Sequence, residues 1–222
     1  MRSVAIQQDG WRHVRGVRVG VDQWIRSGAA ADDRVTAVAP PPAAGPQIPS
    51  ASEPQAGGVP VPDLADRLPR RAAHGQAIAW WVGAHGGAGE TTLARLAFGT
   101  VAAEHSWPMP AAAGIQSRVI LVARTNYAGL TAAQRAAREW ASGALGDAIR
   151  LEGLVLVADQ PGKLPKELRE LAHLVCGGVP RSWELPWVAE WRVAPATPGQ
   201  ALPTAFVRMF SDLNLRPSEF RN

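Results

Sequence analysis

Residues 83–92, with the sequence GAHGGAGETT, combine the glycines and hydroxyls of a loop that can surround phosphate groups. Glycines let the backbone turn tightly, so that several N–H groups can point at one anion. The loop follows an apolar run and precedes a helical pattern, which is the context in which such loops bind nucleotide phosphates. Thr91 stands where these loops ligate Mg²⁺, and Thr92 where they reach an α-phosphate. The residues expected to bind a nucleotide are Gly86, Gly87, Ala88, Gly89, Glu90, Thr91, Thr92 and Asp159.

Glu90 occupies the position where a phosphate-binding loop carries a lysine. A carboxylate there replaces an attraction to phosphate by a repulsion, and two unit charges about 4 Å apart interact by about 1 kcal/mol in water and about 4 kcal/mol at an effective dielectric constant of 20. We therefore expect weak ATP binding, which Glu90→Lys should strengthen. Arg124 or Lys163 could supply the missing cation. The structural alternative is that Glu90 only stabilises the positive end of the following helix.

Asp159 ends another apolar run and is followed by Gln-Pro-Gly. In parallel sheets, ligands gather beyond the carboxyl ends of the strands, so Asp159 and residues 124–126 are expected to lie beside the loop. Asp159 could hold Mg²⁺ through water or orient an attacking water. It could equally belong to an ordinary turn at a strand end. The sequence leaves both interpretations open.

Short apolar runs alternate with amphipathic stretches after residue 76. This alternation predicts an α/β fold in which a small parallel sheet is layered between helices. Buried strands are predicted at 77–84, 118–125 and 151–159, and a further strand with an irregular Trp-rich continuation at 179–193. Helices are predicted at 91–104, 130–145, 164–175 and around 206–213.

The composition divides the chain into three segments. Residues 1–36 form a short N-terminal arm, residues 37–75 a Pro/Ala/Gly-rich linker and lead-in, and residues 76–222 the α/β domain. The stretch 38–62 contains eight prolines and few large apolar side chains. Such a composition cannot build a core, so we expect this stretch to be disordered in the free protein.

The loop resembles the deviant Walker A loop of ParA/MinD-type ATPases, whose pattern is roughly xKGGxGK[ST][ST]. Both lysines of that pattern are replaced, by His85 and Glu90. Residues 158–162 (ADQPG) are similar to the Walker B segment of the same ATPases, and residues 77–193 together resemble an uncharacterised P-loop-like family of high-GC (actinobacterial) bacteria. The residues that match the Walker A pattern are Gly86, Gly87, Gly89, Thr91 and Thr92.

This resemblance implies a P-loop NTPase-like fold, ATP and Mg²⁺ as cofactors, and a role in plasmid or mobile-element maintenance or transfer. No DxD or DxxG switch is visible in residues 102–117, so we expect little or no hydrolysis and assign no catalytic residue. The alternative is a nucleotide-free protein-interaction module. Such a module would use the N-terminal arm or the tryptophans at 183, 187 and 191.

Charge, cysteine content and hydropathy limit which partners, cysteine-based sites and membrane segments can be expected. The formal net charge is only +4, and the basic side chains are nearly all arginines, so the charge does not indicate a nucleic-acid partner, although it leaves one open. A single cysteine, Cys176, excludes an internal disulfide and a cysteine-based metal cluster. No apolar run reaches roughly 18 residues, which predicts a cytoplasmic protein without a membrane span. The expected partner is another protein or a second copy of this chain.

Overall fold

The computed structural model describes residues 53–219, so the predicted arm and much of the predicted linker lie outside the described residues. A five-stranded, all-parallel sheet has the order β3-β2-β5-β6-β7, and β1 and β4 form a separate parallel pair. The strands are β1 (Arg70–Ala72), β2 (Ala79–Gly83), β3 (Thr100–Ala102), β4 (Trp107–Met109), β5 (Ser117–Arg124), β6 (Ile149–Val157) and β7 (Ser182–Leu185). The helices are α1 (Glu90–Leu96), α2 (Tyr127–Ala141), α3 (Lys166–Gly177) and α4 (Thr204–Asp212), with short 3₁₀ turns η1 (Leu64–Asp66), η2 (Gly146–Ala148) and η3 (Ala189–Arg192).

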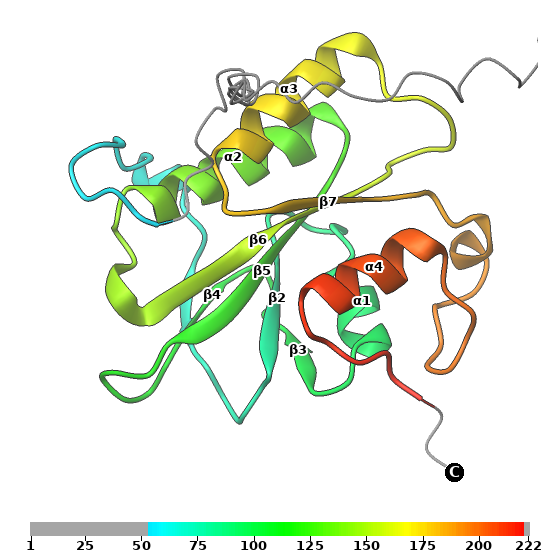
Figure 1. The fold of residues 1–222 in the computed structure, drawn as a ribbon. Coiled ribbons are helices and arrows are strands. Elements are labelled where there is room, and N and C mark those ends of the chain that lie inside the picture. The colour runs from blue at the N-terminus through cyan, green and yellow to red at the C-terminus, as the bar shows by residue number, and fades with distance from the viewer. Residues whose placement is uncertain (1–52, 220–222) are drawn as a thin grey trace, which may run out of the picture. The chain divides into compact units, whose positions relative to one another are not determined.

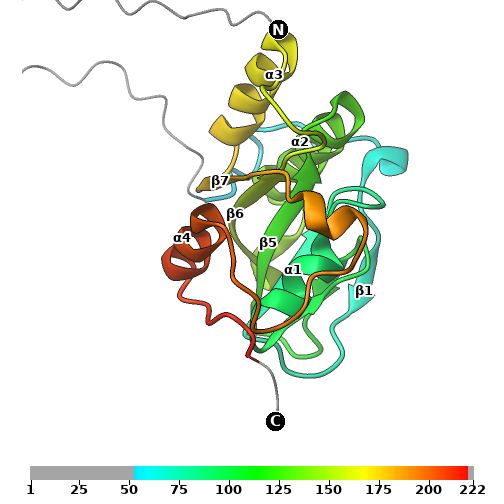
Figure 2. The ribbon, with the colours of Figure 1, turned by 90° about the vertical axis from the view of Figure 1, so that its right-hand side faces the viewer.

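Helices cover both faces of the five-stranded sheet (Figures 1 and 2). α2 and α3 pack on one face, while α1 and α4 pack on the other. Because side chains alternate along a strand, Leu121 of β5 enters the first core and its neighbour Ile120 enters the second. Burial of both faces explains the nearly unbroken apolar runs of β5 and β6, and it confirms the predicted α/β fold with a parallel sheet between helices. No helix within residues 53–219 has the length and apolar character needed to cross a membrane.

The strand order places a switch point between β2 and β5. From β2 the chain turns to one side to form β3, and it then crosses back to form β5, β6 and β7 on the other side. In open parallel sheets, ligands bind at such a point, in the crevice outside the carboxyl ends of the strands. The loop at 84–89 follows β2 and residues 124–126 follow β5, so both flank this crevice.

The helix predicted over 91–104 is wrong in its second half. α1 ends at Leu96, and the chain then forms β3 beside β2. Gly99 has a φ of +73°, in the left-handed region that glycine adopts readily and that commonly follows a helix end. An added Cβ at Gly99 would also lie 2.6 Å from Cδ1 of Ile78, so that any other residue would have to displace this exposed side chain.

Residues 53–75 pack on the α/β domain, so its packed structure begins before the expected boundary at residue 76. β1 pairs with β4, and the side chain of Glu139 on α2, which is 0% exposed, ties both segments to the helix. Its Oε2 atom accepts hydrogen bonds from Leu68 N (3.2 Å) and from Trp107 Nε1 (2.8 Å). A buried carboxylate requires such donors, because an unpaired charge would be costly in the core.

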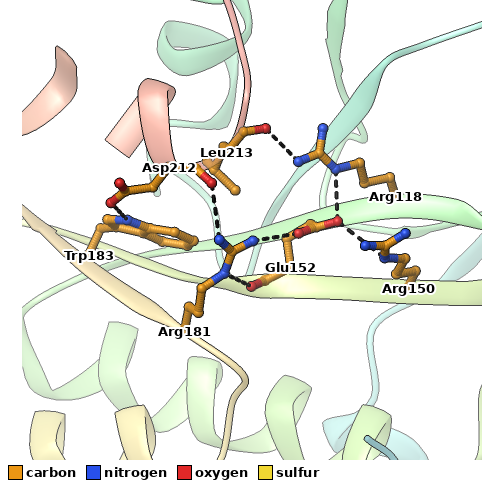
Figure 3. A network of polar contacts seen from close by, with 7 residues as sticks. All are labelled: Arg118, Arg150, Glu152, Arg181, Trp183, Asp212 and Leu213. Carbon is orange, nitrogen blue, oxygen red and sulfur yellow. Dashed lines mark hydrogen bonds and ion pairs between the residues drawn. The ribbon is translucent and has the colours of Figure 1, made fainter. Parts of the chain in front are cut away.

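Glu152 on β6 is the buried centre of an arginine cluster (Figure 3). Two of the arginines also donate to carbonyl oxygens at the C-terminal end of α4, those of Leu213 (2.6 Å) and Asp212 (3.0 Å). Cations at a helix C-terminus complement the helix dipole, so the cluster fixes α4 against the sheet. The carboxylate contacts Arg118 (Nε, 2.8 Å), Arg150 (Nε, 3.3 Å) and Arg181 (Nη2, 2.6 Å).

The pKa of Glu152 lies below its ordinary value. Burial by itself would raise this pKa, but the hydrogen bond from Arg118 and the positive charges of Arg118, Arg150 and Arg181 outweigh burial. A lowered pKa in the folded state stabilises the fold at pH values above the ordinary glutamate pKa. That contribution is lost as the pH falls through the folded-state pKa.

We expect Glu152→Gln to destabilise the protein at pH 7 and to flatten its acid unfolding profile. Loss of hydrogen bonds to a charged group costs roughly 1.5–3 kcal/mol at neutral pH, and the variant no longer has a carboxylate to protonate in acid. Thermal unfolding between pH 7 and pH 3 measures both effects. Glu219→Gln, at an exposed carboxylate, is the control. Parallel pH profiles for the wild type and Glu152→Gln would contradict the assignment.

Candidate functional site

A pocket of about 690 Å³ opens at the carboxyl ends of the strands, at the switch point between β2 and β5. One side is formed by loop glycines and by polar residues that follow β5 and β6. The other side is formed by residues 186–192 after β7 and by the start of α4. The pocket therefore joins segments that lie far apart in the sequence.

The loop after β2 has the backbone form of an anion-binding turn. Gly87 and Gly89 have φ values of +78° and +109°, which residues other than glycine rarely adopt. Ala88 between them is fully buried in the second core and anchors the loop to the domain. Within the described residues, the N–H groups at positions 86, 87 and 89–92 donate to no protein acceptor. They are available to an acceptor such as a phosphate oxygen.

The carboxylate of Glu90 is directed toward the sheet and does not line the pocket. Glu90 is 6% exposed, and its Oε2 accepts hydrogen bonds from Gly83 N (2.6 Å) and from His105 N (3.4 Å). The ring nitrogen Nδ1 of His105 lies 3.3 Å from Oε1. A Cβ at Gly83 would lie 2.7 Å from that ring nitrogen, so this contact also requires glycine at the end of β2. Glu90 thus accepts hydrogen bonds from the backbone N–H groups of Gly83 and His105, which lie beyond the last residue pair between β2 and β3.

His85 connects the loop to β5. Its Nε2 accepts a hydrogen bond from Arg124 N (3.0 Å), and its Nδ1 lies 2.8 Å from Gly86 O. A backbone N–H can only donate, so Nε2 carries no proton and Nδ1 donates to the carbonyl. Both ring nitrogens are therefore used within the protein in this arrangement.

Arg124 brings a guanidinium group into the pocket. Its Nε donates to Gly87 O in the loop (3.2 Å), and its Nη1 donates to Ala158 O after β6 (2.9 Å). These two bonds use two of the five N–H groups of a guanidinium, which leaves three for another acceptor. The sequence proposed Arg124 or Lys163 as the replacement cation. Lys163 lines a neighbouring pocket instead.

Asp159 lies at the rim of the same pocket and is held by Asn126. Asn126 Nδ2 donates to Asp159 Oδ1 (3.0 Å), while Asn126 Oδ1 caps α2 by accepting from Gly129 N (2.8 Å). The backbone N–H of Asp159 donates to Thr125 Oγ1 (3.1 Å). The expected meeting of the loop, residues 124–126 and Asp159 at one edge is therefore present.

Trp187, Trp191 and Phe206 contribute aromatic surface to the pocket. Trp191 packs edge-on against Phe206, with ring centroids 5.1 Å apart and an interplanar angle of 79°. The sequence placed the tryptophans only in the alternative of a protein-interaction module. Their position after β7, at the carboxyl edge of a parallel sheet, is the signal that could have placed them at the site.

Other candidate residues have different surroundings. Thr92 lines the pocket, whereas Thr91 is exposed on α1 and is not among the lining residues. Its assignment as an Mg²⁺ ligand stays a prediction. Residues 53–219 contain no group of three or more His, Cys, Asp or Glu side chains arranged to hold a metal ion. Burial raises the pKa of the Cys176 thiol, which disfavours the reactive thiolate form.

One family model matches this chain, over residues 77–209, and its description is "Family of unknown function (DUF6668)". The matched region includes β2, the loop, Arg124 and Asp159. It also includes Trp187, Trp191 and Phe206, which together form the aromatic wall of the pocket. No curated protein and no solved structure matches the chain.

The burial of Glu90 changes the expected outcome of Glu90→Lys from stronger ATP binding to a less stable fold. An ammonium group cannot accept hydrogen bonds, so the buried Gly83 N would lose its acceptor, at roughly 1–3 kcal/mol, and the half-buried His105 N would lose a longer hydrogen bond. Thermal unfolding should show a midpoint lower by several degrees. Thr91→Lys, which adds the same cation at the adjacent exposed position, should leave the midpoint nearly unchanged. Equal unfolding midpoints for the wild type and Glu90→Lys would contradict this role of Glu90.

Proposed function

This chain belongs to DUF6668, a family of unknown function, and we propose that it binds a nucleotide such as ATP at the loop after β2, with little or no hydrolysis. The observation that carries the proposal is the position of Arg124. Its guanidinium is bonded to the loop at Gly87 O and lines the pocket together with the loop glycines. A phosphate group in this pocket would meet backbone N–H donors and a permanent cation together.

The geometry of the loop supports the phosphate part of this proposal. Its glycines adopt left-handed conformations, and six backbone N–H groups have no acceptor within the described residues. The carboxylate at the lysine position is turned toward Gly83 and is paired there, so the repulsion expected from Glu90 is reduced. Arg124 can form charge-assisted hydrogen bonds with phosphate oxygens, and these are stronger than hydrogen bonds between neutral groups.

The aromatic wall supports the base part of the proposal. Ligand pockets generally measure about 300–1,000 Å³ and combine apolar walls with a few polar groups, and this pocket of about 690 Å³ fits that description. Trp187 and Trp191 offer ring surface on which a planar base can pack. A nucleotide would therefore suit both sides of the pocket, with its phosphates at the loop and its base at the tryptophans.

The way the site's carboxylates are engaged supports the proposed slow or absent hydrolysis. Glu90 is buried against β2, and Asp159 is hydrogen-bonded to Asn126 and follows β6, a strand two positions away from β2 in the sheet. Glu90 does not line the pocket, and the Asp159 carboxylate, which does, is held by Asn126. The relationship to ParA/MinD-type ATPases, and with it a role in plasmid or mobile-element maintenance or transfer, is part of the same proposal. It rests on the resemblance of the loop.

We expect Arg124→Ala to weaken ATP binding by about 10- to 150-fold, because hydrogen bonds to a charged group are worth about 1.5–3 kcal/mol. Isothermal titration calorimetry of the wild type and the variant measures the change. Arg95→Ala removes an exposed arginine from the last turn of α1 and should leave the affinity unchanged. A wild-type protein that binds no nucleotide would overturn the proposal in favour of a nucleotide-free interaction module.

We expect ATP turnover by the purified protein to stay below about 1 s⁻¹, the lower end of the usual range for enzymes. A phosphate-release assay with saturating ATP and Mg²⁺ checks this. Faster turnover that disappears in Thr91→Ala would show a working hydrolytic site and would contradict the proposal.

A further inference from the structure

The residues expected to ligate Mg²⁺ do not fit that role in this pocket. Mg²⁺ prefers oxygen ligands in a nearly ideal octahedron and is usually held by one or two carboxylates together with substrate phosphates. Thr91, at the position of the hydroxyl ligand, is exposed on α1 and outside the pocket lining. A hydroxyl that does not face the phosphates cannot complete the coordination of a metal bound to them.

The carboxylates near the loop are engaged elsewhere. Glu90 Oε2 accepts from Gly83 N, on the side of the loop that faces the sheet. Glu104, after β3, pairs with Arg71 (3.1 Å) and lines a separate pocket. Within the described residues, this leaves Asp159 as the carboxylate that lines the pocket.

Asp159 is a poor metal ligand in this setting. The guanidinium of Arg124 is bonded to the carbonyl of the preceding residue, Ala158 (2.9 Å), and Arg124 and Asp159 line the same pocket. A dication placed beside Asp159 would stand close to this fixed positive charge and would be repelled by it. Arg124 thus lies where a metal ion would be needed to neutralise phosphate charge.

We propose that this site binds the metal-free form of its nucleotide, with the Arg124 guanidinium as the countercharge that Mg²⁺ provides in other nucleotide sites. The inference rests on the proposed nucleotide binding. It adds that the species that binds is the free polyphosphate anion of the nucleotide, without a bound metal ion. Free ATP carries more negative charge than Mg·ATP, so it interacts more strongly with Arg124 and with the backbone N–H groups of the loop.

The first test is calorimetric titration of the full chain with ATP, once with excess EDTA and once with excess Mg²⁺. The affinity should be higher in EDTA, because excess Mg²⁺ converts nearly all of the ATP to Mg·ATP. Arg124→Ala should lose about tenfold or more in EDTA, since the arginine supplies the countercharge. Thr91→Ala should bind ATP as the wild type does under both conditions.

The second test uses Asp159→Asn, for which the two possible roles of Asp159 predict opposite signs. Asparagine keeps the acceptor for Asn126 Nδ2 and removes one negative charge near the phosphates. Metal-free binding predicts an affinity for ATP in EDTA about two- to tenfold higher than that of the wild type. A metal held through Asp159 predicts weaker binding of Mg·ATP. Asp147→Asn, at an exposed aspartate in η2, is the matched control and should change neither affinity.

The outcomes separate this inference from the proposed function. Binding that is about tenfold or more tighter with Mg²⁺ than with EDTA, together with weaker Mg·ATP binding by Asp159→Asn, would overturn metal-free binding and leave nucleotide binding intact. Flat titrations under both conditions would overturn both proposals. Tighter binding in EDTA, with a gain in Asp159→Asn, supports both, whereas equal affinities in EDTA and Mg²⁺ would overturn metal-free binding and leave nucleotide binding intact.

Discussion

The hydrogen bond from Gly83 N to the buried carboxylate of Glu90 determines the geometry of the site. It satisfies a backbone donor at the end of β2, beyond the last pairing with β3, and it directs the side chain of Glu90 toward the sheet. The same carboxylate pairs with His105, whose ring leaves no room for a side chain at residue 83. The acidic residue is therefore part of the framework of the loop. Because the carboxylate does not line the pocket, the repulsion of phosphate that its position in the sequence suggests is reduced.

Arg124, at the end of β5, connects the segments that follow β2 and β6 at the pocket. Its backbone N–H holds His85 in the loop, and its side chain bonds to Gly87 O after β2 and to Ala158 O after β6. These contacts are possible because β5 lies between β2 and β6, directly beside the switch point of the sheet. A cation fixed by two carbonyls loses little further freedom when a phosphate binds. This preorganisation lowers the entropy cost of binding an anion at Arg124.

The aromatic wall depends on a different part of the molecule. The Glu152 cluster, at the other end of α4, holds the last carbonyls of that helix through Arg118 and Arg181 (Figure 3). The first turn of α4 then presents Phe206 to Trp191 at the pocket. A buried ion cluster far from the loop therefore sets the position of the apolar side of the site.

The sequence by itself determined the fold class and the strands that carry the site. Short apolar runs that alternate with amphipathic helices are typical of strands covered on both faces, and parallel strands put the loop, Arg124 and Asp159 at one edge. The direction of Glu90, the break of α1 before Gly99 and the packing of residues 53–75 were decided only by tertiary structure. Each depends on a partner distant in the sequence, such as His105 for Glu90. Residue type and spacing identify which groups can hydrogen-bond, but only the packed fold decides which donors and acceptors meet.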